Sequence, residues 1–247
     1  MKRYFITFAY DGTNYKGYQR QPKLKTIQGE LEKVLKKINN NKDVEVSASG
    51  RTDALVHALN QYAHFDLEVK ITEDKLLQAL NTYLPKDIYI KRVEEVDMDF
   101  HARYMVTGKE YIYVINMGEY NPLERNYAYQ YNKKLDIHEI ERAMKFLEGE
   151  HDFRSFTATD EQSENCVRKI VQTNLTRDLK DINKITLSFV GNGFLKYMIR
   201  NIVGTLIEVG EGKRKSEDII KILESKDRTK AAKTASAEGL YLKNVFY

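Results

Sequence analysis

Strand-like and helix-like apolar patterns follow one another along this chain in a definite order. In the first half, apolar runs predict strands over residues 3–9, 44–48, 61–67 and 88–93. Apolar residues at helical spacing predict one helix after Thr26, which suits an N-cap, and a second helix that ends before Pro85. The order is therefore β-α-β-β-α-β, which can close an antiparallel sheet with both helices on one face.

The second half repeats this order without repeating any sequence motif. The first predicted element is a strand at 110–115, and a helix to residue 147 follows Asp136, which suits a helix N-cap. The remaining predicted elements are strands at 169–177 and 184–190, helices at 194–209 and 216–224, and a strand at 240–245. We predict an α+β fold of two ferredoxin-like βαββαβ subdomains, residues 1–105 and 106–247, whose antiparallel sheets lie side by side around a central cleft. The long polar segment 149–167 predicts a mobile loop.

Composition limits the class of protein. The 247 residues are 42% hydrophobic, enough for a large core, and 31% charged, and no apolar run is long enough for a transmembrane helix. The basic and then apolar start is too short for a signal peptide, and the single cysteine, Cys166, excludes a disulfide framework or a cysteine zinc site. We expect a cytoplasmic protein without membrane association, and the net charge of +4 permits a nucleic-acid partner without requiring one.

Residues 50–53, with the sequence Gly-Arg-Thr-Asp, lie in a predicted loop between two strands. A carboxylate two residues from a guanidinium has its charged form favoured, so Asp53 suits an anionic nucleophile better than a proton donor. The alternative is a turn in which Asp53 caps its own backbone, and the local residues alone favour that alternative.

Residues 10–21 combine three tyrosines with cations and glutamines. Interleaved aromatic, amide and cationic side chains suit looped RNA, in which bases stack and phosphates pair with charge. The alternative is a solvated loop whose tyrosines fold back on the core.

Arg200 lies in the middle of the nearly uniformly apolar helix predicted at 194–209. A buried guanidinium needs a carboxylate partner, and Asp53 is the candidate. The alternative is a narrow solvated stripe that Arg200 shares with Lys196 and Asn201.

Taken together, these segments resemble the tRNA pseudouridine synthase A family from residue 10 to the C-terminus. Each match is weak alone, but their order and spacing are specific. The matching residues are 10–13 with 17–19, 28–31, 50–54 with 56–58, 81 with 84–85 and 87–88, 100–104 with 109 and 111, 149 with 151–153 and 156, 193–195 with 198–204, and 239–242.

Four positions depart from the family pattern. Leu55 and Asn60 replace glycines, Tyr18 replaces a tryptophan, and Ser236 replaces a proline. Leu55 matters most, because a glycine there would allow tight backbone geometry beside the nucleophile. The departures leave open a divergent paralogue with altered activity or substrate range.

The resemblance implies isomerisation of uridine to pseudouridine at positions 38, 39 and 40 of the tRNA anticodon stem-loop. The glycosidic bond breaks and C5 rejoins C1′, without cofactor or metal, in a homodimer. Asp53 would be the nucleophile, and Arg51 would hold the space that the base leaves. Arg200 would keep Asp53 ionised, and Tyr111 would stack on the base and take the C5 proton; on local grounds alone, Tyr111 would be a core residue. Since Asp53, Arg51, Tyr111 and Arg200 are all present, we expect an active enzyme.

The substrate-binding candidates include Arg51 and Tyr111, and otherwise are mostly cations suited to phosphate contacts: Gln19, Arg20, Lys23, Lys25, His57, Arg103 and Lys109. For each single cation the alternative is a solvated face, and for His57 it is a structural hydrogen bond. The histidines show no metal-binding spacing.

Three other functions remain open at this point. The chain could be a non-catalytic tRNA- or RNA-binding protein, an aspartate-dependent hydrolase of a nucleoside or sugar bond, or a pseudouridine synthase with another RNA target. Asp53 speaks against the first, because an acidic side chain facing RNA is unfavourable unless the chemistry needs it.

Overall fold

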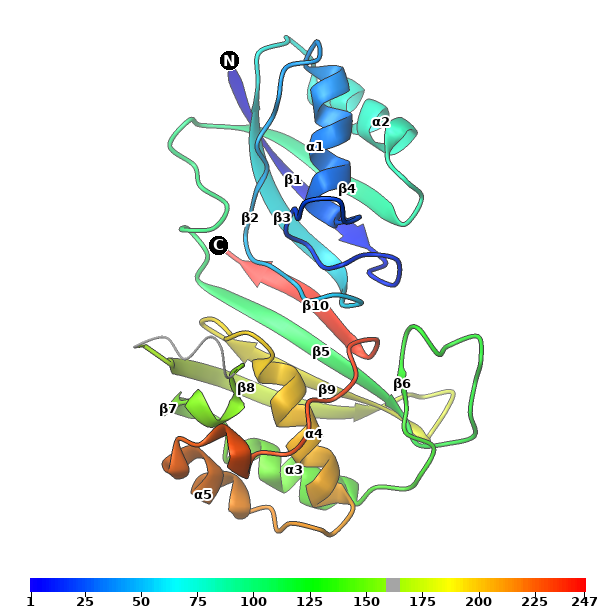
Figure 1. Ribbon diagram of the computed structural model, residues 1–247, viewed down its shortest axis with the longest axis vertical. Coiled ribbons are helices and arrows are strands. Elements are labelled where there is room, and N and C mark those ends of the chain that lie inside the picture. The colour runs from blue at the N-terminus through cyan, green and yellow to red at the C-terminus, as the bar shows by residue number, and fades with distance from the viewer. Residues whose placement is uncertain (159–164) are drawn as a thin grey trace. The chain divides into compact units, whose positions relative to one another are not determined.

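The structure, a computed structural model, describes residues 1–158 and 165–247 of a mixed α+β chain whose sheet is mostly antiparallel. The strands are β1 (Lys2–Tyr10), β2 (Ser47–Ala48), β3 (His57–Leu67), β4 (Ile88–Val96), β5 (Gly108–Asn116), β6 (Tyr129–Gln130), β7 (Gly149–Asp152), β8 (Val167–Arg177), β9 (Lys184–Gly191) and β10 (Leu240–Phe246). The α-helices are α1 (Ile27–Ile38), α2 (Glu73–Tyr83), α3 (Ile137–Lys145), α4 (Met198–Gly210) and α5 (Asp218–Ser225) (Figure 1).

The chain divides into two compact units. Unit 1 comprises Met1–Thr107 together with Tyr241–Tyr247, and unit 2 comprises Gly108–Leu240. Almost all of β10 therefore belongs to unit 1, although it is the last strand of the chain.

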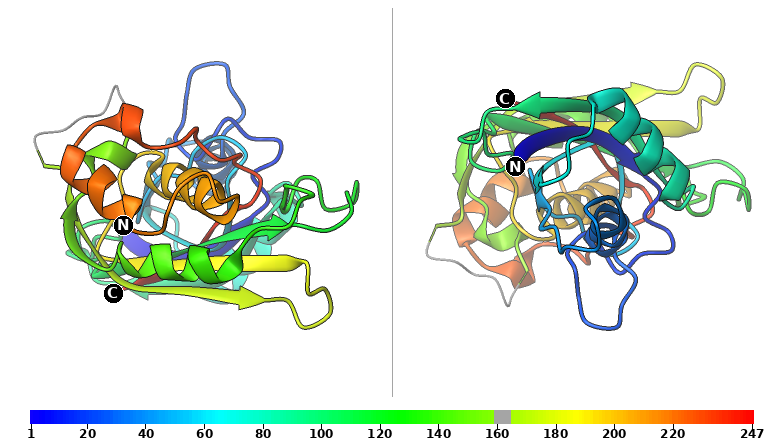
Figure 2. Two further views of the ribbon diagram at one scale, coloured as in Figure 1. Left: turned by 90° about the horizontal axis from the view of Figure 1, so that it is seen from below. Right: turned by 90° about the horizontal axis from the view of Figure 1, so that it is seen from above.

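The sheet of unit 1 has the strand order β4-β1-β3-β10, and β2 pairs with β3. Strand β1 is antiparallel to both neighbours, whereas β10 runs parallel to β3, with Tyr241 opposite His57. Alternate residues of β1 are buried, as the period of a strand requires: Tyr4, Ile6, Phe8 and Tyr10. Helices α1 and α2 cover one face of this sheet (Figures 1 and 2).

The predicted cap of α1 is confirmed, because the Thr26 side chain accepts the backbone N–H of Gly29. The strand predicted at 44–48 is largely wrong, since only Ser47 and Ala48 pair with β3. Val46 is buried, but its backbone N–H donates to Glu32 Oε1 at 3.2 Å instead of to a neighbouring strand. The apolar pattern here reflects burial without a strand ladder.

The sheet of unit 2 has the order β5-β9-β8-β7 with antiparallel pairs, and the short β6 pairs parallel to β5. Alternate residues of β9 are buried, among them Ile185, Leu187 and Phe189. Asp136 caps α3 as predicted, through its side chain and the Glu139 N–H. Helices α3 and α4 pack together over one face of this sheet (Figure 2).

Two predictions in unit 2 are corrected. The segment predicted as a mobile loop at 149–167 contains β7, which pairs with β8, and a 3₁₀ turn at Arg154–Phe156. Phe153 and Phe156 are completely buried and anchor this part, while residues 159–164 lie outside the described chain. Helix α4 begins at Met198 instead of at residue 194, because Tyr197 before it has a φ of 61° and breaks the helical backbone.

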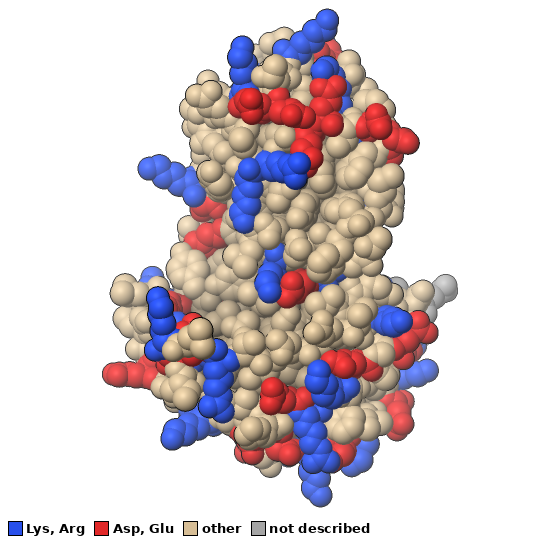
Figure 3. Space-filling model, turned by 180° about the vertical axis from the view of Figure 1, so that it is seen from behind, with Lys and Arg blue, Asp and Glu red and all other residues tan. Residues whose placement is uncertain are grey.

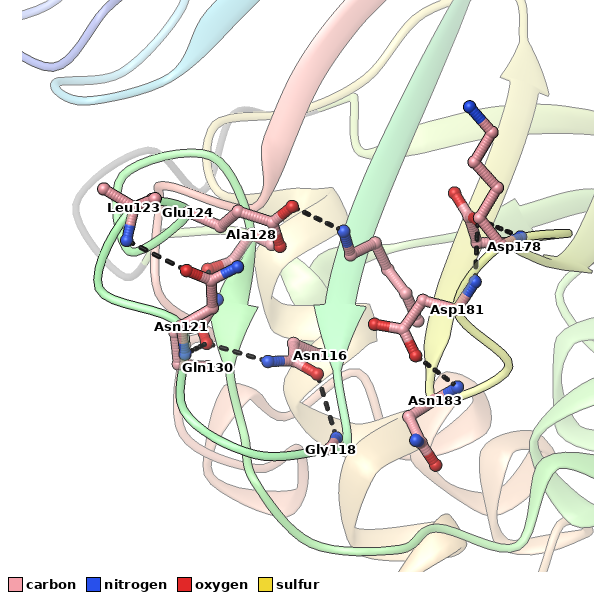
Figure 4. Close-up of polar contacts among 12 residues, drawn as sticks. Asn116, Gly118, Asn121, Leu123, Glu124, Ala128, Gln130, Asp178, Asp181 and Asn183 are labelled. Carbon is pink, nitrogen blue, oxygen red and sulfur yellow. Dashed lines mark hydrogen bonds and ion pairs between the residues drawn. The ribbon is translucent and has the colours of Figure 1, made fainter.

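The segment between β5 and α3 is organised by side-chain amides (Figure 4). Asn116 Nδ2 donates to the Glu119 carbonyl and to Gln130 Oε1, both at 2.8 Å. Its Oδ1 accepts the Gly118 N–H at 2.9 Å, and Gln130 Oε1 also accepts the Asn121 N–H at 2.9 Å. One buried asparagine thereby ties three points of a long connection together.

Candidate active site

Asp53 lies in a tight turn that leads into β3. Its carbonyl accepts the Val56 N–H at 3.2 Å, which closes a β-turn with Ala54 and Leu55 at the central positions. Leu55 has a φ of 68°, and a positive φ at the second central position is what a type II turn requires. Glycine usually fills that position, so the turn geometry is glycine-like although the residue is leucine.

The segment 12–18 lies directly against this turn. A Cβ on Gly12 would lie 2.0 Å from the Val56 carbonyl oxygen, and a Cβ on Gly17, whose φ is 91°, would lie 3.0 Å from the Thr52 oxygen. The Thr52 oxygen also accepts the Tyr18 N–H at 3.0 Å. Two glycines therefore permit a backbone-to-backbone approach that fixes the path of residues 52–56.

Buried polar side chains hold the turn from inside the unit. The Tyr10 and Thr52 hydroxyls are 2.7 Å apart. Gln61, completely buried, accepts from the Ser49 hydroxyl at 2.6 Å and donates to the Gly50 carbonyl at 3.2 Å. Burial raises the pKa of Tyr10 to about 12, so its hydroxyl stays protonated and able to donate at neutral pH.

His57 closes the turn at its downstream end. Its Nδ1 accepts the Gly12 N–H at 3.0 Å, and its ring stacks on Tyr241 of β10 with centroids 4.7 Å apart. Asp11 Oδ1 lies 3.2 Å from the same nitrogen. With only 2% of His57 exposed, these contacts favour the structural hydrogen-bonding role over direct contact with a substrate.

The two charged side chains of this segment are accessible to different degrees. Arg51 is exposed and Asp53 is half-buried, while Thr52 between them is buried. The alternating burial follows from the Thr52 contacts described above. The arrangement can present a cation and a carboxylate from one rigid piece of backbone.

In unit 2, Tyr111 lies on β5 opposite Phe189 of β9. Its side chain is 9% exposed, and the edge of its ring meets Phe194 at a centroid distance of 5.2 Å. The ring is thus fixed by packing, with a small part of its surface open to solvent.

Arg200 is half-buried on α4. Its Nε donates to the Ala235 carbonyl at 2.8 Å, its own carbonyl accepts the Ala235 N–H at 3.0 Å, and its guanidinium lies 5.1 Å from the centre of the Tyr197 ring. The solvated stripe considered as an alternative is wrong at Asn201, which is completely buried and donates to the Phe156 carbonyl at 2.7 Å.

The predicted phosphate contacts differ in their surroundings. Gln19, Lys23 and Arg103 are exposed, and Lys109 is half-buried. Arg20 pairs with Glu32 at 3.0 Å, and Lys25 lies 4.4 Å from the centre of the Tyr15 ring. On the face of unit 2 drawn in Figure 3, basic and acidic side chains are interspersed and do not form one basic patch.

Sequence reasoning missed the residues that support the turn, chiefly Tyr10, Gly12, Gly17 and Gln61. The two glycines in the segment 10–21 were a usable signal, because closely spaced glycines often mark a close backbone approach. The partner of that approach is about forty residues away along the chain and leaves no local trace.

Within residues 1–158 and 165–247, no group of three or more His, Cys, Asp or Glu side chains is arranged to hold a metal ion. No helix of this described part is both long and apolar enough to cross a membrane.

Comparison with known proteins gives this geometry its context. Residues 6–105 and 143–247 match a family model described as tRNA pseudouridine synthase. The chain belongs to this family. A protein named tRNA pseudouridine synthase A from Lacticaseibacillus casei (strain BL23) is 46% identical over 248 residues, covering all of both chains. The proteins of that name from Streptococcus mutans serotype c (strain ATCC 700610 / UA159) and Geobacillus sp. (strain WCH70) are 43% and 44% identical, covering all of this chain and 99% and 98% of theirs.

The tRNA pseudouridine synthase model covers the Asp53 turn and the Arg200 helix, whereas Tyr111 and Lys109 fall between its two matched stretches. A solved structure titled "Crystal Structure of a Cbf5-Nop10-Gar1 Complex" covers 82% of this chain and 54% of its own, with a TM-score of 0.33 and 12% identity. A likeness at that level supports no inference about this member of the family.

Proposed function

We propose that this protein isomerises uridine to pseudouridine in tRNA, with Asp53 as the nucleophile. The observation that carries the proposal is the Asp53 turn: a carboxylate and an exposed Arg51 presented from a backbone that two glycines and four buried polar groups hold in place. Membership of the tRNA pseudouridine synthase family, over the full length of curated relatives, supplies the reaction class.

The reaction breaks the N1–C1′ bond of the target uridine and forms a C5–C1′ bond, while a proton leaves C5 and N1 gains one. A carboxylate is suited to the first step, because it can attack the reacting nucleoside or stabilise positive charge that develops at the sugar. The fixed position of Asp53 favours this first step, since a side chain on a fixed turn needs no reordering when charge develops. No cofactor or metal enters the proposed scheme.

Arg51 has the role of occupying the space that the uridine leaves when it departs from its stack. Chemistry on a base inside a helix requires the base to swing out, and the opened stack has to be supported. Arg51 suits this because it is exposed and lies two residues from Asp53 on the same turn.

Tyr111 and Arg200 complete the proposed machinery. Tyr111 stacks on the uracil ring and takes the C5 proton, and its fixed, mostly buried ring supports a positioning role. Arg200 pairs with Asp53 and keeps it ionised; a guanidinium already oriented by Ala235 and Tyr197 suits that task.

The proposal includes the partner and the target positions. The partner is the anticodon stem-loop of tRNA, and the protein acts as a cytoplasmic homodimer of chains with ferredoxin-like subdomains. Uridines 38, 39 and 40 of the stem-loop are the targets, and the phosphate contacts come from Gln19, Arg20, Lys23, Lys25, Arg103 and Lys109, which are exposed or half-buried.

The test uses tRNA transcripts that carry a single uridine at position 38, 39 or 40, and a fourth transcript with none of them. Pseudouridine is mapped after incubation with the protein in chelator-treated buffer. Pseudouridine at one or more of the three positions, and none in the fourth transcript, is the expected result. Pseudouridine only in other RNAs would replace the tRNA target with another, and tight tRNA binding without any product would indicate a non-catalytic binding protein.

A further inference from the structure

Leu55 adopts a backbone conformation that is unfavourable for a leucine. Its φ of 68° lies in the left-handed region, which is strained for a residue with a branched side chain. The surroundings enforce that conformation, because the Leu55 N–H donates to the Tyr15 carbonyl at 3.4 Å and the Val56 N–H closes the turn onto Asp53. A glycine would adopt the same conformation without strain.

The leucine side chain packs only partly against the protein. It is 42% exposed, whereas Val56 beside it is 2% exposed and supplies the apolar anchor of the turn. Neither the backbone conformation nor the core therefore explains a leucine at this position. Strain kept at a site where the fold gains little from the side chain points to a function outside the folded chain.

The location indicates what that function is. Leu55 is two residues from Asp53, on the turn that also presents the exposed Arg51. A base that leaves its stack exposes the apolar faces of its neighbours, and apolar side chains are commonly inserted against such faces. An isobutyl group beside the nucleophile fits this use, whereas a glycine would leave the surface bare.

We propose that Leu55 contacts an unstacked nucleotide next to the target uridine and helps to select which uridine reaches Asp53. This inference rests on the proposed function, since it assumes an RNA substrate at the Asp53 turn. It assigns to Leu55 a substrate-contacting, specificity-determining role, and it accounts for a strained leucine where glycine would be unstrained.

The experiment compares three Leu55 variants with wild type on tRNA: Leu55→Ala, Leu55→Gly and Leu55→Met. If RNA covers the exposed part of the Leu55 side chain, Leu55→Ala and Leu55→Gly lose this apolar contact. Each should raise Kd and KM for tRNA roughly fivefold. Both should leave kcat within about twofold and shift the distribution of pseudouridine among adjacent uridines. Met restores the apolar volume and should restore Kd. Leu59→Ala, at a leucine of β3 that is 39% exposed, is the matched control and should change none of these quantities.

Two results would overturn the inference. The first is unchanged Kd, KM and product distribution in Leu55→Ala, with the wild type active. The second is a difference in Kd or KM between Leu55→Gly and Leu55→Ala that follows the difference in their melting temperatures. Such a result would mean that Leu55 acts through the backbone. A third outcome separates the two proposals. If the wild type makes no pseudouridine but Leu55→Ala loses tRNA affinity, the RNA contact is supported and the proposed reaction is contradicted.

Discussion

Two connecting segments of this protein are fixed by different kinds of contact. The Asp53 turn of unit 1 is fixed by backbone contacts with Gly12 and Gly17, so close that no side chain fits between them. The connection after β5 in unit 2 is fixed by the side chain of Asn116, whose amide spans several backbone and side-chain partners (Figure 4). Backbone contacts leave no alternative position for the turn, whereas the connection after β5 depends on the amide of a single side chain. The first arrangement suits a site whose geometry has to be accurate, and the second suits a connection that only needs to be ordered.

The largest effect expected from this difference is that of an added methyl group. Gly12→Ala would place a Cβ 2.0 Å from a backbone oxygen of the turn, so we expect a loss of about 3 kcal/mol in the free energy of unfolding, and loss of activity. Gly118→Ala would place its new Cβ 3.0 Å from Asn183 Cβ and 3.3 Å from Asn116 Oδ1, a milder clash than that at Gly12, so its expected loss is about 1 kcal/mol. Urea unfolding of both variants measures the difference, and equal losses would contradict the contrast.

Removal of the organising amide is the next largest change. Asn116→Ala deletes three hydrogen bonds of a buried side chain, and we expect unit 2 to lose about 2 kcal/mol of stability with kcat unchanged. Tyr10→Phe removes one hydroxyl next to Thr52, with an expected loss of about 1 kcal/mol and a clear loss of kcat. Thermal unfolding and initial rates on tRNA separate the two, and a fall in kcat in Asn116→Ala alone would reverse the assignment.

The two units should also differ in how their stability depends on pH in the acidic range. Burial, together with the nearby Arg3 and His101, lowers the pKa of His64 in unit 1 to about 4, and its Nδ1 accepts the Ala102 N–H at 3.1 Å. The unfolded chain binds this proton near pH 6.5, so the stability that the neutral ring contributes is present above pH 6.5 and is lost as the pH falls towards 4. We expect the free energy of unfolding to fall by about 2 kcal/mol over this range.

His64→Asn offers an acceptor without this titration and should flatten the pH dependence, whereas His138→Gln, at an exposed histidine of unit 2, should leave it as in wild type. Unfolding in urea at pH 7 and at pH 4.5 measures both. The same slope in wild type and His64→Asn would show that another group controls acid stability.

The smallest effect concerns the ion pair beside the Asn116 connection. Lys184 Nζ lies 2.7 Å from Glu124 Oε1, but both groups are partly exposed, so Lys184→Met should cost below about 1 kcal/mol. The loss should shrink further in 0.5 M salt. A loss as large as that of Asn116→Ala would show that charge, and not the amide, organises this connection.

The local features of the fold were predictable from sequence, and the long-range ones were not. The strands β1 and β9 and the caps Thr26 and Asp136 express properties of neighbouring residues, and the structure confirms them. The pairing of β10 with β3 joins segments more than 180 residues apart, which no local pattern encodes. The segment at 149–156 was misjudged because its polar residues outnumber Phe153 and Phe156, although those two decide its packing.

The same division holds for the candidate site. The residue types at 50–53 predict a loop with a carboxylate, and the structure has irregular backbone at 50–53 that leads into a turn beginning at Asp53. Its supports at Gly12, Gly17, Tyr10 and Gln61 come from other strands and loops, so only folding brings them to the turn. The catalytic roles of Asp53, Arg51, Tyr111 and Arg200 remain predictions that enzymology has to test.

The central claim is that Asp53 carries out uridine isomerisation on a preformed turn. The most direct measurement is tritium release from tRNA labelled at uridine C5, with wild type, Asp53→Asn and Asp53→Glu at equal tRNA occupancy. We expect release by wild type and a loss of at least about a thousandfold in both variants, with tRNA Kd and melting temperature near those of wild type. Release by Asp53→Asn at the wild-type rate, or no release by any of the three with tRNA bound, would contradict the claim.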